Sequence, residues 1–367
     1  MKVETVIRTL DEVCGDRHLP DASDPGNLIA VNDARKATFE SNPFLVGRDS
    51  QTQMLGIAEK EVIGKLNVFP LEIVADGEVL SATCGDSLFV RDEYRRTLYA
   101  LTLMDRLNKI SADKISLSAG FSAKAQELIK IMRNIVFPLR QFIVVRHSRA
   151  IFSTFGRFHF LRRFAWLFDA MLIPYRLGTK VVARFALNGF ERVEISVDDE
   201  FAIGKFAELI KQDKHRFREN VTSKWIDWVL RNDFHSDRLI AKRLFGFRRN
   251  GEFVAFVMTR ESREGNGMLG SVIEWQTKSG FEKYEKSMLM DVMQHILSRL
   301  DCVAIAVGGQ DAGAYHFAQG FLPGLGRSVV SIGVGGKDSS LKRYDGHDVL
   351  ANWRLRTGMG DLCFSYV

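Results

Sequence analysis

A basic turn between an apolar strand and an apolar helix is the feature of this chain best suited to chemistry. Residues 77–90 form an apolar run typical of a strand, Arg91, Arg95 and Arg96 follow, and an apolar helix is expected over 97–109. The first backbone N–H groups of a helix have no partner within it, and the helix dipole favours negative charge there. The sequence therefore predicts an anion site, suited to a phosphate, just past Val90.

Metal and nucleophile chemistry are not indicated. The four cysteines, Cys14, Cys84, Cys302 and Cys363, lie far apart without C-x-x-C spacing, and the histidines show no H-x-x-x-H or H-E-x-x-H pattern. No G-x-S-x-G, Walker or Rossmann motif occurs. We expect no metal site and no disulfide framework, in keeping with a reducing cytoplasm.

Length and composition indicate an ordinary globular protein of two domains. The chain has 367 residues, 46% of them hydrophobic and 26% charged. Its N-terminus lacks the apolar core of a signal peptide, and no apolar run has the ~18 residues that span a bilayer. We expect a soluble, cytoplasmic protein. The net charge of +6 would attract anionic partners without choosing among them.

The order of predicted elements is repeated along the chain. In the first half, strands joined by an Asp76-Gly77 hairpin lead to the basic turn, a helix, a strand near 114–120, a helix near 122–132 and a strand near 142–145. The second half repeats this order, with a hairpin at Asn250-Gly251. We expect an internal duplication with domains at 1–148 and 188–367 and a helical connector at 149–187.

The connector combines aromatic and basic residues. Between 149 and 184, phenylalanines and Trp166 alternate with arginines such as Arg157, Arg162 and Arg163. Such a segment can lie on a membrane surface or bind another anionic ligand. It can equally be a helix whose aromatic face is buried between the two halves while its arginines stay in water. We favour burial, because the pattern is irregular for a basic amphipathic helix.

The sequence of the basic turn resembles the acyl-CoA-binding motif of the GNAT acetyltransferase superfamily, which is V-x-P-x-[YF]-[RQ]-x-x-G-x-[GA]. Val90, Tyr94, Arg95 and Ala100 match it, whereas Asp92 replaces the Pro and Leu98 replaces the first Gly. The resemblance implies acetyl-CoA or another acyl-CoA as the donor, with its pyrophosphate on the loop amides. The implied cofactor-binding residues are Val90, Arg95, Arg96, Thr97, Leu98, Tyr99 and Ala100.

A segment of the second half resembles another GNAT motif, N-x-x-A-x-x-L-Y-x-x-x-G-F, whose Tyr is the general acid for the leaving thiolate. Ala312, Gly320 and Phe321 match in register, which places His316 at the acid position and Tyr315 one residue earlier. In the first half Ile129 occupies that position. Each half therefore keeps a motif that the other has lost.

Acyl transfer to an amine also needs a base and donors for the developing oxyanion, which the family takes from a backbone N–H on the fourth strand. Glu274, at the end of its strand beside Trp275, is the first candidate base, with Glu72 and Asp86 as candidates in the first half. The alternative for each is a solvated or salt-bridged carboxylate.

Trp353 belongs to a C-terminal segment that loosely resembles the W-x-x-T-x-G-D-x-D ending of uncharacterised bacterial tandem GNAT-like proteins. We expect it to close the last strand against the second domain.

The expected fold class is α+β, with two GNAT-like domains that are each a mixed, mostly antiparallel sheet flanked by helices. The expected function is an acyl-CoA-dependent N-acyltransferase acting on an amine of a small molecule or sugar. The alternative is a catalytically inactive tandem GNAT-like module that binds a partner, a glycan precursor or a membrane surface. An aminoacyl-transferase using charged tRNA is a weaker option, and no residue pattern indicates specific nucleic-acid binding.

Overall fold

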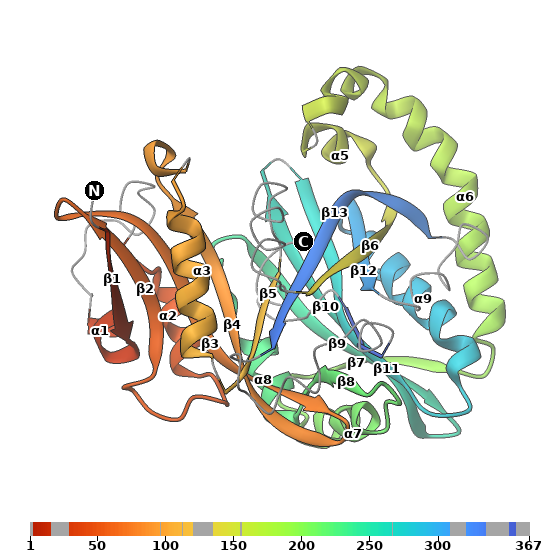
Figure 1. Ribbon diagram of the computed structural model, residues 1–367. Coiled ribbons are helices and arrows are strands. Elements are labelled where there is room, and N and C mark those ends of the chain that lie inside the picture. The colour runs from red at the N-terminus through yellow and green to blue at the C-terminus, as the bar shows by residue number, and fades with distance from the viewer. Residues whose placement is uncertain are drawn as a thin grey trace.

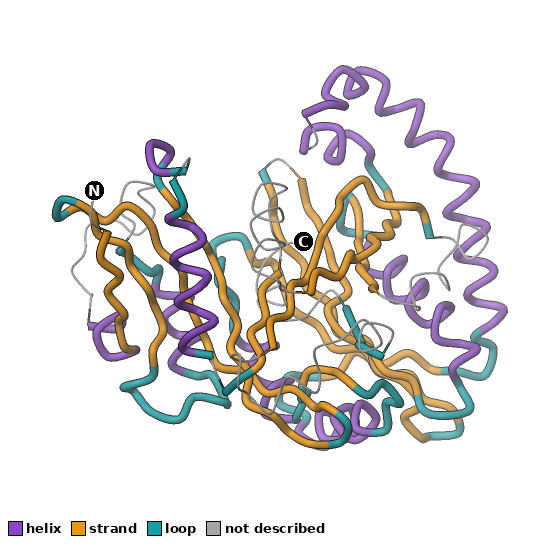
Figure 2. Tube along the Cα trace, viewed as in Figure 1, coloured by secondary structure: helices purple, strands orange, loops and turns teal. Residues whose placement is uncertain are grey.

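The computed structural model describes residues 3–15, 29–95, 97–111, 113–119, 135–154, 156–265, 267–308, 321–334 and 352–356. The strands form a single hydrogen-bonded sheet of 13 strands, flanked by helices (Figures 1 and 2). Neighbouring strands are mostly antiparallel, and the two parallel pairs, β4 with β5 and β11 with β12, occupy corresponding places in the two halves. The predicted α+β fold is confirmed.

The described elements of the two halves follow the same order, as the predicted duplication requires, and the helix predicted near 122–132 lies outside the described residues. Each half runs strand, two helices, three strands, helix, strand and a last strand, so β4 corresponds to β11 and α3 to α9. The first half contains β1 (Val3–Thr9), α1 (Leu10–Gly15), α2 (Asp33–Glu40), β2 (Gln51–Ala58), β3 (Glu61–Ala75), β4 (Glu78–Val90), η1 (Asp92–Tyr94), α3 (Tyr99–Ile110), β5 (Ile115–Ala119) and β6 (Ile135–Val145).

The second half has one extra element, the short strand β8, which pairs with β3 of the first half. Its elements are β7 (Glu191–Ile195), α7 (Glu200–Lys211), β8 (Phe217–Glu219), α8 (Ser223–Arg231), β9 (Leu239–Arg249), β10 (Glu252–Glu264), β11 (Gly267–Thr277), η3 (Glu282–Tyr284), α9 (Glu285–Leu297), β12 (Cys302–Gly308) and β13 (Leu322–Val334).

The last strands of the two halves are exchanged. β6 of the first half pairs with β12 of the second, and β13 of the second half pairs with β5 of the first. β6 and β13 also pair with each other, which joins the halves into one sheet. Hydrogen bonding thus crosses the domain boundary expected at residue 148. Neither half completes its sheet without a strand from the other.

The hydrophobic core also extends across both halves. Phe69 on β3 packs against Phe39 on α2 and against Trp228 on α8, with ring centres 6.1 and 6.3 Å apart. The Trp228 indole N–H donates to the backbone oxygen of Thr38 at 2.9 Å. Because aromatic side chains contribute large buried areas, this contact ties α8 of the second half to the sheet of the first.

Both predicted hairpin turns are confirmed. Asp76-Gly77 joins β3 to β4 and Asn250-Gly251 joins β9 to β10, with positive φ at all four residues, as a type I′ turn requires. The turn between β2 and β3 also has positive φ, at Glu59 (52°) and Lys60 (70°). It contains no Gly or Asn, so the residue types did not indicate it.

The connector consists of α5 (Ser148–Thr154), η2 (Gly156–Phe164) and α6 (Ala165–Ala186). Its predicted burial between the halves is wrong. Helix α6 runs along the outer edge of the second half, away from the junction (Figure 1), and only Ala165 and Ala183 are buried among its described side chains. Trp166 is 69% exposed and Phe185 is 78% exposed. None of the helices in the described ranges is long and apolar enough to cross a membrane.

Candidate functional site

The basic turn forms a corner between β4 and α3, and Thr97 and Leu98 at this corner are exposed. The turn's own N–H groups are used locally: Tyr94 donates to the Arg91 carbonyl at 2.9 Å, and Tyr99 donates to the Thr97 hydroxyl at 3.3 Å. For the N–H groups of Leu98, Ala100 and Leu101, the described residues provide no acceptor. An anion at this end of α3 would meet donors that have no acceptor in the described part of the chain, together with the positive end of the helix dipole.

The side chains around the corner leave it open on the Leu98 side. Leu98 is 75% exposed, so it does not fill the space above the helix start. The guanidinium of Arg95 donates to the Val90 carbonyl at 3.0 Å and pairs with Asp92 at 2.7 Å. Arg91 pairs with Glu61 at 3.1 Å. Arg91 and Arg95, two of the predicted basic residues, thus form contacts within and beside the turn. The third, Arg96, lies outside the described residues.

Tyr99 fixes the start of α3 against the sheet. Its ring lies over Gly56 and Gly64, which face each other across β2 and β3. A Cβ added at Gly56 would lie 1.7 Å from the Tyr99 hydroxyl oxygen. Burial raises the pKa of Tyr99, so the phenol stays neutral at physiological pH. Because Gly56 and Gly64 have no side chains, the Tyr99 ring can pack against the sheet and hold the start of α3 in place.

Replacing Gly56 with alanine should lower the free energy of unfolding by about 1–3 kcal/mol, because the added methyl overlaps the Tyr99 ring. Gly204→Ala in α7 is the control, since no atom lies within 4 Å of its added Cβ. It should stabilise the protein by up to about 1 kcal/mol through helix propensity. Urea denaturation measures both, and equal midpoints for the two variants would contradict this packing.

The fourth strand of each half has a β-bulge where the sheet opens. In β4, Asp86 pairs with Asn67 and Phe89 with Lys65, so Ser87 and Leu88 together face Leu66, and Ser87 has a φ of 54°. The parallel ladder between β4 and β5 ends at Gly85, although β4 continues to Val90. A bulge leaves one residue without a ladder partner, so a backbone N–H is available beside the diverging strands.

A row of buried polar side chains crosses the sheet beside this bulge, on the face opposite α3. Gln53, Asn67 and Asp86 are consecutive cross-strand neighbours on β2, β3 and β4, and all three are buried. Arg35 of α2 approaches Asp86 at 3.4 Å. The pKa of Lys65 is lowered, mainly by burial and secondly by the positive charge of Arg35. A polar, charged cluster therefore covers the α2 side of the bulge.

Several atoms of this cluster lack a hydrogen bond. Among the described residues, the Arg35 Nε, the Asn67 Nδ2 and the Asp86 Oδ2 are buried without a partner of suitable geometry. Leaving a buried polar atom unsatisfied costs about 1–3 kcal/mol. The Arg35 Nε and the Asp86 Oδ2 are the two atoms of the 3.4 Å ion pair, so of these three atoms the Asn67 Nδ2 is the one suited to an acceptor atom of a polar ligand.

Glu72, a candidate base, lies away from this cluster. It pairs with Ser81 on β4, six residues before Ser87, which places it roughly 20 Å along the strand from the bulge. Its carboxylate accepts a hydrogen bond from the Asn220 side chain at 2.7 Å. Its contacts link β3 to the second half.

The corresponding opening in the second half is occupied by the segment 352–356. The parallel ladder of β11 and β12 covers only three residue pairs and ends at Ser271, after which the strands diverge. Arg356 forms an antiparallel bridge with Val307 on β12, and Gly308 donates to the Leu355 carbonyl at 3.0 Å. Trp353 stacks on Phe217 of β8 with ring centres 5.4 Å apart.

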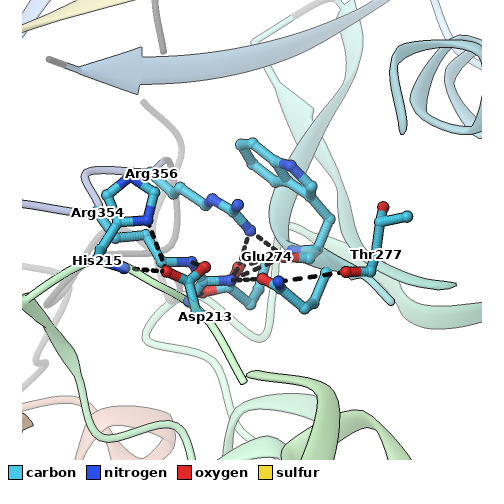
Figure 3. A network of polar contacts seen from close by, with 8 residues as sticks. Asp213, His215, Glu274, Thr277, Arg354 and Arg356 are labelled. Atoms are coloured by element: carbon cyan, nitrogen blue, oxygen red, sulfur yellow. Dashed lines mark hydrogen bonds and ion pairs between the residues drawn. The ribbon is translucent and has the colours of Figure 1, made fainter. Parts of the chain in front are cut away.

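Glu274 on β11, the first candidate base, belongs to a buried ion-pair network with arginines of the segment 352–356 (Figure 3). Arg354 and Arg356 bind one of its carboxylate oxygens, Oε1, at 2.7 and 2.8 Å. Arg354 also pairs with Asp213 at 3.0 Å. Burial by itself would raise the pKa of Asp213, but the hydrogen bond from His215 and the nearby arginines hold it well below its usual value. These contacts give Glu274 the environment of a structural anion.

The candidate acids, Tyr315 and His316, lie outside the described residues, as does Ile129. No group of His, Cys, Asp and Glu side chains in the described ranges could hold a metal ion. The polar row includes two residues, Gln53 and Asn67, that we did not predict as site residues. Asn67 stands between Leu66 and Val68 in an otherwise apolar strand, and that interruption was the available signal.

Comparison with known proteins identifies the fold. No protein-family model matches the chain, and no curated protein matches it in sequence. Among solved structures, a Saccharomyces cerevisiae N-myristoyltransferase with bound myristoyl-CoA is 14% identical, with 93% of this chain and 82% of that chain covered and a TM-score of 0.54. A GCN5-related N-acetyltransferase from Anabaena variabilis is 11% identical, with 90% and 72% covered and a TM-score of 0.52.

A third similar structure is a conserved protein of unknown function from Enterococcus faecalis, described as a probable N-acyltransferase. It is 12% identical, with 90% of this chain and 72% of that chain covered and a TM-score of 0.51. At these identities the likeness establishes the fold alone: the chain has the GNAT fold.

Proposed function

We propose that the protein is an N-acyltransferase that takes its acyl group from acetyl-CoA or another acyl-CoA bound to the first half. The observation that carries this proposal is the exposed start of α3, where three N–H groups have no acceptor among the described residues. A diphosphate fits such a site because it accepts several hydrogen bonds and complements the helix dipole. The GNAT fold and its acyl-CoA-bound structural neighbour support the assignment.

The proposed reaction uses the diverging ends of β4 and β5. The thioester carbonyl lies against the bulge at Ser87 and Leu88, whose unpaired N–H stabilises the oxyanion that forms as the amine attacks. Asp86, directly before the bulge, accepts the proton from the attacking nitrogen, and the carbon–sulfur bond then breaks to release the CoA thiolate. Asp86 also has polar partners, the Arg35 guanidinium at 3.4 Å and the Ser87 hydroxyl, which donates to it at 2.9 Å. It is held by one arginine, whereas Glu274 is held by two, Arg354 and Arg356.

The proposed acceptor is the amine of a small molecule or sugar, bound on the α2 side of the sheet. The side-chain amides of Gln53 and Asn67 can bind hydroxyl groups, and Asp86 attracts the amino group. The unsatisfied Asn67 Nδ2 supports a polar acceptor over an apolar one. We propose cytoplasmic action, where acyl-CoA is available.

Isothermal titration with acetyl-CoA tests the proposal, with longer acyl-CoAs compared under the same conditions. Two results would support it: saturable binding of acetyl-CoA, and release of free thiol from acetyl-CoA that depends on added glucosamine or another primary amine. If CoA binds but no amine promotes thiol release, the protein is the inactive binding module. Absence of binding at millimolar acyl-CoA would contradict both the donor and its site.

Replacing Ala100 with proline should weaken CoA binding about tenfold. Proline removes one N–H donor yet is tolerated in the first turn of a helix, so the fold should persist. Phe201→Pro is the matched control, because Phe201 holds the same second position in α7. Titration of both variants with CoA checks this prediction, and a parallel loss of affinity in both would indicate a general effect of proline on the fold.

A further inference from the structure

Helix α6 presents an apolar face to solvent. Ala165 and Ala183 mark its buried side. At 100° per residue, the exposed apolar side chains other than Ile173 occupy the opposite half of the helix, over a length of about 30 Å. Leu177 is 59% exposed and Val181 is 52% exposed. Further exposed apolar side chains of the helix are Trp166, Met171, Val182 and Phe185.

This arrangement is the reverse of an ordinary surface helix, which buries its apolar stripe and exposes its polar one. In α6 the single carboxylate, Asp169, is turned inward and accepts the backbone N–H of Ser148 at 2.7 Å. Phe160 and Phe164 of η2 continue the exposed apolar surface. Contiguous apolar patches of this extent on soluble proteins mark interaction sites, so the face needs a partner that covers it.

The charge around the face identifies the kind of partner. Residues 156–186 contain six Lys and Arg residues and one acidic residue, in a chain whose net charge is +6. Arg163, Lys180 and Arg184 are exposed, and none has an ion-pair partner in the part of the chain that the structure describes. A cavity of about 480 Å³ opens between α6 and α9, lined in part by Lys180 and Arg184 and by Arg192, which pairs with Asp291 at 2.5 Å.

We infer that α6 lies in the plane of an anionic lipid bilayer, with its apolar face among the acyl chains and its cations at the headgroups. A bilayer supplies both environments at once: an apolar layer for the helix face and negative charge for Lys180 and Arg184. Trp166, near the start of α6, suits the interface between them. A second copy of this chain is disfavoured, because a two-fold interface would bring the same cations together.

Co-sedimentation with vesicles tests this inference independently of acyl transfer. The wild type should bind phosphatidylcholine vesicles containing 30% phosphatidylserine at least tenfold more tightly than pure phosphatidylcholine. The double variant Leu177→Asp/Val181→Asp should lose this binding, and both positions are exposed, so the fold should tolerate the change. Phe201→Asp, at a 68% exposed apolar position on α7, is the control and should bind as the wild type does.

The cations should contribute separately. Lys180→Gln and Arg184→Gln should each lower the affinity for anionic vesicles about fivefold and leave weak binding to neutral vesicles unchanged. The inference is overturned if the wild type ignores anionic vesicles or if the double aspartate variant binds them normally. It is also overturned if light scattering gives a wild-type dimer that the double variant converts to a monomer, since a second copy would then cover the face.

Discussion

Replacing Asp86 with asparagine should lower kcat for acyl transfer by about 10²- to 10⁴-fold while CoA affinity stays near the wild-type value. The amide keeps the size of the carboxylate but cannot accept the proton released by the attacking amine. The corner proposed to bind CoA starts at Val90, beyond the bulge, so the substitution does not alter it directly. Thiol release from acetyl-CoA with saturating amine measures the effect.

Two comparisons separate catalysis from folding in this experiment. Asp105→Asn, on the exposed side of α3 where Asp105 pairs with Lys109 at 2.6 Å, should leave kcat unchanged. Because Arg35 would lose its anionic neighbour, thermal unfolding of Asp86→Asn must be recorded beside its kcat. A folded Asp86→Asn variant with wild-type kcat would remove Asp86 from the mechanism.

Replacing Glu274 with glutamine should lower the free energy of unfolding by about 3–5 kcal/mol, because two buried guanidinium groups would lose their shared anion. CoA binding at the first-half corner should persist in the fraction that remains folded. Urea denaturation monitored by tryptophan fluorescence measures the stability, because the five tryptophans include Trp275 beside the network.

Glu252→Gln is the matched control, since the Glu252–Lys278 pair is exposed, and its loss should cost about 0–1 kcal/mol. The comparison also distinguishes the two candidate bases. A Glu274→Gln variant with normal stability and a large loss of kcat would move the chemistry to the second half and contradict the role of Asp86 as the base.

The features that local patterns determine were predicted from the sequence. The turn residues Asp76-Gly77 and Asn250-Gly251 set both hairpins through their positive φ values. The duplicated order of elements followed from apolar runs and their spacing, and the described elements follow it. The GNAT fold followed from a few motif residues around Val90, and the structural neighbours confirm it.

The features that depend on distant contacts were not predicted. The exchange of β6 and β13 leaves no local trace, because an apolar strand pairs equally well with either half. The environment of Glu274 depends on Arg354 and Arg356, which lie 80 and 82 residues later in the chain. The exposure of α6 was predicted wrongly because an apolar helix face has the same sequence whether a protein core or another partner covers it.

A crystal structure of the protein soaked with CoA tests most directly whether the first half holds the acyl donor. We expect the diphosphate at the start of α3, within hydrogen-bond distance of the N–H groups of Leu98, Ala100 and Leu101, and the thiol directed toward the bulge at Ser87. A diphosphate at the start of α9, or an empty α3 corner in a crystal holding CoA elsewhere, would contradict the proposed donor site.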